Sequence, residues 1–172
     1  MNQPPKHPIT TASIEYAVAQ MMDWRRNIIV PNVSWGLNIH ECDLLVVRKS
    51  GFAIEVEIKT SAADIRADKK KRHGHRSVKI KELYFAVPYD LADNKDIPER
   101  AGIIAVSRGE SGISRLRAVI KREPKINADA HKLTEQEIAK VMHLGCMRIW
   151  RLKELCVYNG TYWLTTGRCN CL

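Results

Sequence analysis

A chain of 172 residues, 45% hydrophobic and 27% charged, is long enough to bury the core of one globular domain. It has no apolar run long enough to cross a bilayer, and its polar first residues do not resemble a signal peptide, so we expect no membrane partner and a cytoplasmic location. The net charge of +9 favours a polyanionic partner, and the five scattered cysteines are expected to be reduced thiols.

In the first half of the chain we predict a flexible arm at residues 1–10 and a helix at residues 12–26. Three strands are predicted to follow, at residues 28–35, 40–47 and 52–59. Thr11 is expected to cap the helix. Pro31 is expected to break the first strand. The second and third strands flank the polar turn at residues 48–51, so we expect them to pair as an antiparallel hairpin.

The second half predicts a helix starting at Ser61, strands over residues 82–87, 102–106 and 113–120, and a helix starting with the capping box at residues 134–137. Gly145 is a candidate interruption of that last helix, and Asn159-Gly160 is expected to close a terminal hairpin between residues 156–158 and 161–164. The order of helix, three strands, helix, three strands and helix predicts an α/β fold with a mixed sheet between helices.

The central hairpin holds the main functional signal. Its second strand alternates, with Ile54, Val56 and Ile58 on one face and Glu55, Glu57 and Lys59 on the other. The pairing brings Asp43 of the first strand near Glu57 and Lys59. Buried charges are costly unless they are paired or bind a metal, so this group favours a divalent-metal site that hydrolyses phosphodiesters. The alternative is an exposed sheet face with a Glu–Lys pair.

An acid on one strand and Glu-x-Lys on the next, after an N-terminal helix, resembles the PD-(D/E)XK nuclease superfamily. A wider set of segments resembles the MmcB-like bacterial DNA-repair proteins of that superfamily: Val56–Ser61, Asp64, Asp68, Lys69, Tyr84–Pro88, Ile97-Pro98 and Ala101–Ala105. The resemblance covers residues 10–120. It implies a single domain with a restriction-endonuclease-like mixed β-sheet flanked by helices. The nuclease-like core then spans residues 11–125, and residues 126–172 supply a helix and a candidate hairpin packed on it.

The resemblance also assigns roles to single residues. Asp43 and Glu57 match the metal-binding acids, with the main-chain carbonyl of Ile58 as a further ligand, and Lys59 matches the lysine that orients or deprotonates the attacking water. Glu15 matches a helix-borne acid of part of the superfamily, although a favourable charge near the helix N-terminus also explains it. Oxygen ligands of this kind imply Mg²⁺ or Mn²⁺. The chain departs from the family at position 42, where a cysteine stands in place of the name-giving proline.

The densest basic patch follows the Glu-x-Lys strand and is expected to bind DNA phosphates through Lys69, Lys70, Lys71, Arg72, Arg76 and Lys79. A solvated helix end is the other interpretation. We do not expect His73 and His75 to be metal ligands.

The function expected from these features is a metal-dependent nuclease that hydrolyses DNA phosphodiester bonds, in DNA repair or in the processing of phage or mobile-element DNA. A non-catalytic DNA-binding module that retains the nuclease fold is the first alternative, and an adaptor that docks through its C-terminal helix is the second. A homodimer is an open option.

Overall fold

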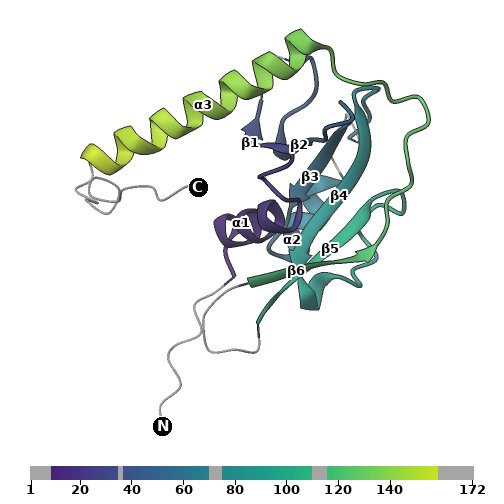
Figure 1. The fold of residues 1–172 in the computed structure, drawn as a ribbon. Helices are drawn as coiled ribbons and strands as arrows, with labels where there is room; N and C mark the ends of the chain where they lie inside the picture. The colour runs from purple at the N-terminus through teal and green to yellow at the C-terminus, as the bar shows by residue number, and fades with distance from the viewer. Residues whose placement is uncertain (1–8, 35–36, 70–74, 110–115, 159–172) are drawn as a thin grey trace.

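The chain folds around a six-stranded sheet, as seen in a computed structural model of the protein (Figure 1). The structure describes residues 9–34, 37–69, 75–109 and 116–158. The elements are α1 (Thr11–Met21), β1 (Ile28–Val33), β2 (Cys42–Val47), β3 (Ala53–Ile58), α2 (Ala62–Asp68), β4 (Ile80–Pro88), the 3₁₀ turn η1 (Tyr89–Leu91), β5 (Gly102–Arg108), β6 (Leu116–Arg122) and α3 (Glu135–Tyr158). This confirms the predicted order of helices and strands.

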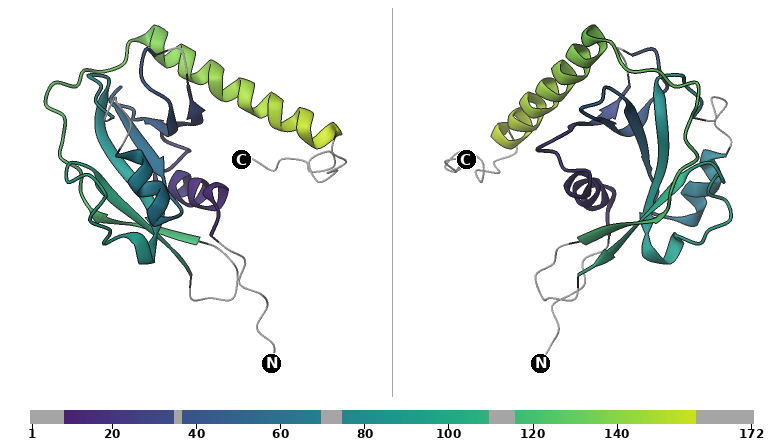
Figure 2. Two further views of the ribbon diagram at one scale, coloured as in Figure 1. Left: turned by 180° about the vertical axis from the view of Figure 1, so that it is seen from behind. Right: turned by 45° about the vertical axis from the view of Figure 1, so that its right-hand side comes forward.

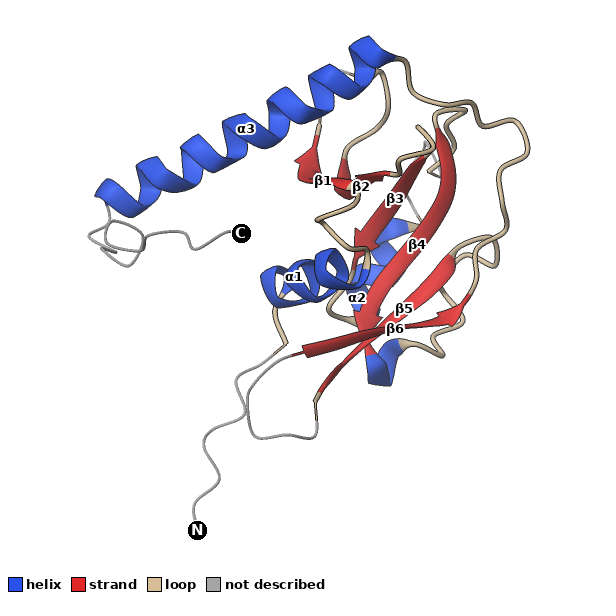
Figure 3. Cartoon of the chain, in the orientation of Figure 1, coloured by secondary structure: helices blue, strands red, loops and turns tan. Residues whose placement is uncertain are grey.

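The strands lie side by side in their order along the chain, from β1 to β6 (Figure 3). The pairs β1–β2, β2–β3 and β5–β6 are antiparallel, whereas β3–β4 and β4–β5 are parallel. A parallel connection needs a crossover, and α2 supplies the one between β3 and β4. The predicted α/β fold with a mixed sheet flanked by helices is therefore confirmed.

Helices cover both faces of the sheet (Figure 2). On one face, α1 buries Ile14, Ala17 and Val18 against the apolar side chains of the central strands. On the other face, one apolar cluster includes Val141 and Leu144 of α3, and a second includes Ile65 of α2. The buried polar side chains Glu55, Glu57 and Lys59 considered below lie on this second face.

The central hairpin is confirmed as an antiparallel pair, with Leu45 opposite Glu55 in the β2–β3 register. The Arg48 N–H donates to the Phe52 carbonyl at 3.0 Å, which closes the turn. Gly51 has φ +85°, a left-handed conformation that side-chain-bearing residues rarely adopt. The glycine therefore allows the turn to be this tight.

Two predictions in the first half need correction. Thr10, not Thr11, caps α1, because its Oγ1 accepts the Ser13 N–H at 3.3 Å, and the helix ends at Met21 rather than residue 26. Pro31 does not break β1 but pairs with Leu44 within it. A proline is tolerated there because β1 lies at the edge of the sheet and needs hydrogen bonds on one side only.

The capping box of α3 is confirmed, since the Glu137 N–H donates to Thr134 Oγ1 at 3.2 Å and the Thr134 N–H to Glu137 Oε2 at 2.9 Å. Gly145 does not interrupt the helix. Residues 156–158, predicted as a strand, are the last turn of α3. The rest of the predicted terminal hairpin lies outside the described residues, as do residues 113–115 of the strand that became β6.

Among the described residues, no helix is both long enough and apolar enough to cross a membrane. The cysteines of the described ranges, Cys42, Cys146 and Cys156, are free thiols, as predicted.

Candidate active site

The structure brings together Asp43, Glu57 and Lys59 at one end of the central hairpin. Continuing the β2–β3 register by one residue places Asp43 opposite Glu57. Lys59 Nζ lies 2.8 Å from Glu57 Oε2 and 3.9 Å from Asp43 Oδ2. The Ile58 N–H donates to Asp43 Oδ2 at 2.8 Å, which ties the first strand's acid to the second strand. The three charged side chains therefore form one group.

The predicted alternation of β3 is confirmed, but both of its faces are buried. Ile54, Val56 and Ile58 pack in the core cluster beneath α1. On the other face, Glu55 is 0% exposed, Glu57 is 1% and Lys59 is 5%. The interpretation of this face as an exposed Glu–Lys surface is therefore wrong, and these charges need partners in the interior.

Lys59 finds a further partner at the end of α2. Its Nζ lies 3.0 Å from Oδ1 of Asp68, which is itself buried. Burial alone lowers the pKa of a lysine, but the hydrogen bonds and charges of Glu57 and Asp68 outweigh it, so the pKa of Lys59 is raised. The side chain is thus held as an ammonium.

His75 links two of the buried acids. Its Nδ1 lies 2.6 Å from Glu55 Oε1 and its Nε2 lies 2.6 Å from Asp68 Oδ2. Burial lowers the pKa of His75, but the hydrogen bonds to Asp68 and Glu55 and the charges of Glu55 and Glu57 raise it to about 9. In this arrangement the imidazolium bridges the end of α2 and the middle of β3.

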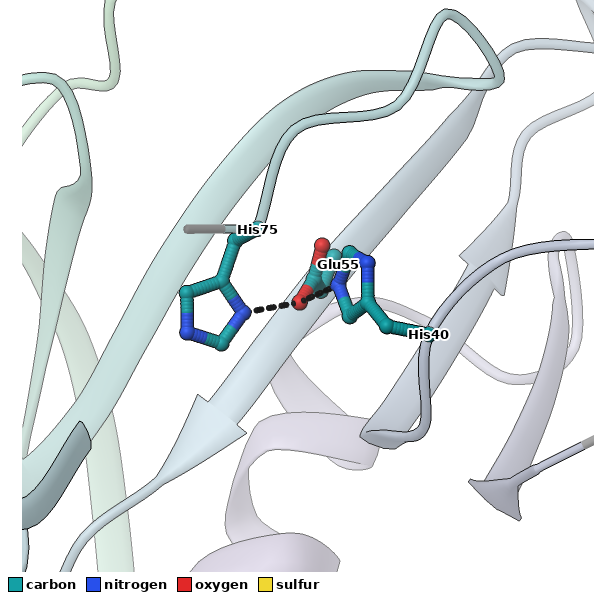
Figure 4. A group of neighbouring side chains, drawn as sticks. All are labelled: His40, Glu55 and His75. Atoms are coloured by element: carbon teal, nitrogen blue, oxygen red, sulfur yellow. Dashed lines mark hydrogen bonds and ion pairs between the residues drawn. The ribbon is translucent and has the colours of Figure 1, made fainter. Parts of the chain in front are cut away.

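A second histidine reaches the same acid. His40 Nε2, from the segment before β2, lies 2.6 Å from Glu55 Oε1, so both imidazoles converge on one oxygen (Figure 4). Burial raises the pKa of Glu55, yet the hydrogen bonds and charges of His40 and His75 lower it overall. The other oxygen, Glu55 Oε2, is buried and has no hydrogen-bond partner among the described residues.

Glu15 of α1 lies near Asp43, one member of the charged group formed with Glu57 and Lys59. It is half-buried in α1, and both this burial and the charge of Asp43 raise its pKa. The first turn of α1 contains no acidic residue, so Glu15 is not placed to stabilise the helix dipole there. The interpretation of Glu15 as a charge that stabilises the helix dipole is therefore wrong. What the structure shows instead is that Glu15 lies close enough to Asp43 to feel its charge.

The predicted basic patch is divided. Lys70, Lys71 and Arg72 lie outside the described residues. Lys69 forms an ion pair with Asp96 at 2.6 Å, and Lys79 one with Glu137 at 2.5 Å. Arg76 is exposed and lines a pocket with Arg100 and Lys125, two cations that the sequence prediction did not include.

Sequence reasoning gave no site role to four members of the buried network, namely His40, Glu55, Asp68 and His75, although Asp68 belongs to the segments that resemble the MmcB-like proteins. Glu55 could have been found, because it alternates on the same face as Glu57 and Lys59. Asp68 and His75 carry no such signal, since their positions depend on how the chain returns from β3 to β4. His75 also has φ 55°, which a local sequence pattern does not reveal.

Comparisons with known proteins support the fold alone. No family model matches the chain, and no curated protein matches it. A solved structure described as SPO1766, a protein of unknown function from Silicibacter pomeroyi, is similar with a TM-score of 0.60 and 16% identity, over 88% of this chain and 92% of that one. The fold is therefore shared with another protein over nearly its whole length.

Proposed function

We propose that the protein is a divalent-metal-dependent nuclease of the PD-(D/E)XK type that hydrolyses DNA phosphodiester bonds, in DNA repair or in phage or mobile-element DNA processing. The observation that carries the proposal is the meeting of Asp43 and Glu57 around the Lys59 ammonium, with each carboxylate within 4 Å of Nζ. A phosphodiester repels hydroxide by its charge, and an acid pair with a lysine is the set of groups that can overcome this.

The donor set fits Mg²⁺ or Mn²⁺. Asp43, Glu57 and the Ile58 carbonyl would hold the ion, and all three offer the hard oxygen atoms that these ions prefer. The side chain of Asp43 is 37% exposed, whereas that of Glu57 is 1% exposed, so the group opens to solvent on the Asp43 side. When bound there, the ion would supply screening of the phosphate charge and acidification of water.

Lys59 contributes positive charge. Its raised pKa, caused by Glu57 and Asp68 against the effect of burial, keeps it protonated at neutral pH. An ammonium held 2.8 Å from Glu57 and 3.0 Å from Asp68 suits electrostatic stabilisation of the transition state, one of the two roles implied by the resemblance. Glu57 and Asp68 hold the ammonium in position, so the residue does not need to move to act.

Phosphate binding would come from the surface cations. Arg76, Arg100 and Lys125 line one pocket, and the chain carries a net charge of +9. These cations suit a polyanion, and the sequence supplies further basic residues at positions 70–72.

The test is a cleavage assay on supercoiled plasmid with Mg²⁺ or Mn²⁺, combined with calorimetric Mg²⁺ titration. Lys59→Ala should cut cleavage by about 10²- to 10⁴-fold while retaining Mg²⁺ binding, because both carboxylates remain. Glu57→Gln should weaken Mg²⁺ binding and abolish cleavage together. Lys153→Ala, which removes an exposed cation on α3, is the matched control and should cleave at the parental rate.

If Lys59→Ala cleaves DNA at the parental rate, Lys59 has no role in the mechanism. If the parent binds DNA but cleaves it with neither ion, the protein is the non-catalytic DNA-binding module. The deep burial of Glu57 is the observation that favours this second candidate, because it leaves little room for a substrate at that acid.

A further inference from the structure

His40, Glu55 and His75 form a group of metal-ligand type that the proposed phosphodiester chemistry does not use. Their ligand atoms, one from each residue, all lie within 4.8 Å of one another. His40 precedes β2, Glu55 lies within β3 and His75 precedes β4, so three separate segments converge on one buried point (Figure 4).

We propose that His40, Glu55 and His75 bind a Zn²⁺ ion. Two imidazole nitrogens with a carboxylate oxygen are a donor set that Zn²⁺ takes, whereas Mg²⁺ prefers oxygen ligands alone. The site is therefore chemically distinct from the oxygen donors of Asp43, Glu57 and Ile58, and it goes beyond the proposed nuclease activity without depending on it.

The geometry needs little change to admit the ion. His40 Nε2 and His75 Nδ1 each lie 2.6 Å from Glu55 Oε1. Zinc–ligand distances of about 2.0–2.2 Å place tetrahedral ligand atoms roughly 3.4 Å apart. Each nitrogen would therefore withdraw from the oxygen by less than about 1 Å on metal binding.

The second carboxylate oxygen of Glu55 is available to complete the coordination. Glu55 Oε2 is buried and lacks a hydrogen-bond partner among the described residues, a condition that is costly and that a cation relieves. This oxygen is therefore an uncompensated acceptor on the residue where the two imidazoles converge.

The surroundings of His75 suit a ligand. Its second nitrogen, Nε2, lies 2.6 Å from Asp68 Oδ2, the carboxylate contact that commonly orients a metal-binding histidine. Its backbone is held at φ 55°, with its carbonyl accepting a hydrogen bond from the Arg100 guanidinium at 2.8 Å. Because Asp68 also pairs with Lys59, the zinc ion would fix the acid that positions the candidate catalytic lysine.

The rival explanation is a metal-free network in which a protonated His75 bridges Glu55 and Asp68. The test uses the full chain, stripped of metal by a chelator and titrated with Zn²⁺ by calorimetry, and with Co²⁺ by visible absorption. We expect one Zn²⁺ per chain and the intense absorption of Co²⁺ in a low-coordinate nitrogen and oxygen site. Absence of Zn²⁺ binding by the parent would establish the metal-free network and overturn the proposal.

Variants locate the ion. His40→Gln and His75→Asn should each weaken Zn²⁺ binding by more than about 100-fold. Mutating a residue that only hydrogen-bonds to a metal ligand already lowers metal affinity by about 10- to 100-fold, and these variants remove the ligands themselves. Asparagine is chosen because it tolerates the left-handed backbone at position 75. His143→Gln, at an exposed histidine of α3, is the matched control, and Asp43→Asn tests the separate oxygen site. Both should bind Zn²⁺ like the parent.

Equal Zn²⁺ affinity in the His40, His75 and His143 variants, or loss of Zn²⁺ only in Asp43→Asn, would overturn the proposal. If the buried variants do not fold, nitrogen-resolved NMR of the parent replaces them: two histidines should shift on addition of Zn²⁺, and unchanged histidine signals would refute the site. Zn²⁺ binding is measured without DNA, so its failure and a failure of nuclease activity are separately visible.

Discussion

Asp68 is the residue that joins the two charged groups of the interior. Its carboxylate lies 3.0 Å from Lys59 Nζ and 2.6 Å from His75 Nε2. Removing one charged group of a buried ion-pair network leaves its partners as uncompensated charges, which strongly destabilises the fold. The position of the candidate catalytic lysine therefore depends on the last residue of α2 as well as on its own strand.

A single glycine limits the packing between β4 and β5. A Cβ added at Gly102 would lie 2.5 Å from the ring of Tyr84 and 2.9 Å from the Arg122 carbonyl oxygen. Gly102→Ala should therefore lower the free energy of unfolding by about 1–3 kcal/mol or more, as overpacking does in other cores. Urea denaturation measures this. Gly145→Ala, whose Cβ would lie 3.3 Å from Val30, is the control and should cost much less.

At the scale of elements, α3 buries apolar side chains against the sheet through its first half, and in its second half the Arg148 guanidinium donates to the Asn32 carbonyl of β1 at 2.6 Å. Val141 and Leu144 are buried in the cluster beside β1. The second half extends away from the sheet (Figure 1). It also exposes apolar side chains. Among them, Ile149, Trp150 and Leu152 are each more than half exposed. The apolar docking of α3 therefore rests on a few side chains of its first half.

Leu144→Ala should lower the free energy of unfolding by about 2–4 kcal/mol, because it removes a buried side chain and leaves a cavity. Met142→Ala, two residues away on the same helix and 53% exposed, should change it by no more than about 0.5 kcal/mol. Chemical denaturation of the two variants compares them directly. Equal effects would show that α3 does not pack on β1 in solution.

The start of α3 should also make stability depend on acid pH. Hydrogen bonds from Lys79 and from Thr134 lower the pKa of Glu137 from 4.5 to about 2, although burial opposes them. A lowered pKa means that the carboxylate stabilises the fold above pH 4.5 and loses this effect as the pH falls toward 2.

Thermal denaturation between pH 5 and pH 2 should therefore show a shallower loss of stability for Glu137→Gln than for the parent. Glu135→Gln, at an exposed acid of the same turn, should follow the parent. A Glu137→Gln profile parallel to that of the parent would show that the Lys79–Glu137 contact has no energetic role.

At the scale of the whole molecule, net charge is the property that indicates what kind of partner the protein binds. The chain carries an excess of nine positive charges, and some cations among the described residues are already paired with acids, as Lys69 and Lys79 are. Paired cations neutralise phosphates less readily than unpaired ones. The basic residues at positions 70–72 thus remain the main sequence-based prediction for DNA binding.

Replacing Lys70, Lys71 and Arg72 together by alanine should weaken DNA binding and flatten its salt dependence. If all three contact phosphates, the slope of log K against log salt concentration should fall by about 2.7. The control replaces Lys140, Arg151 and Lys153 on α3, which removes the same net charge elsewhere and should leave the slope nearly unchanged. Fluorescence anisotropy at several salt concentrations measures both, and equal slopes in the two variants would place the DNA elsewhere.

The sequence by itself determined the order of the elements and the central hairpin, but not every element boundary. Alternation in β3, the turn at Gly51 and the capping box at Thr134 are local patterns, and each acts within a few residues of the chain. The hairpin register follows from such local features, which is why the nearness of Asp43 to Glu57 and Lys59 could be predicted. The assignments of function to these residues came from resemblance and remain predictions.

Only the tertiary structure decided what surrounds that group. Burial of Glu55 and Glu57 depends on segments that return over the sheet from outside the hairpin. The bridge from Glu55 through His75 to Asp68, and from there to Lys59, joins residues whose contacts are set by the return of the chain from α2 to β4. Such contacts have no periodic signature, because they arise from packing between distant segments rather than from the geometry of one helix or strand.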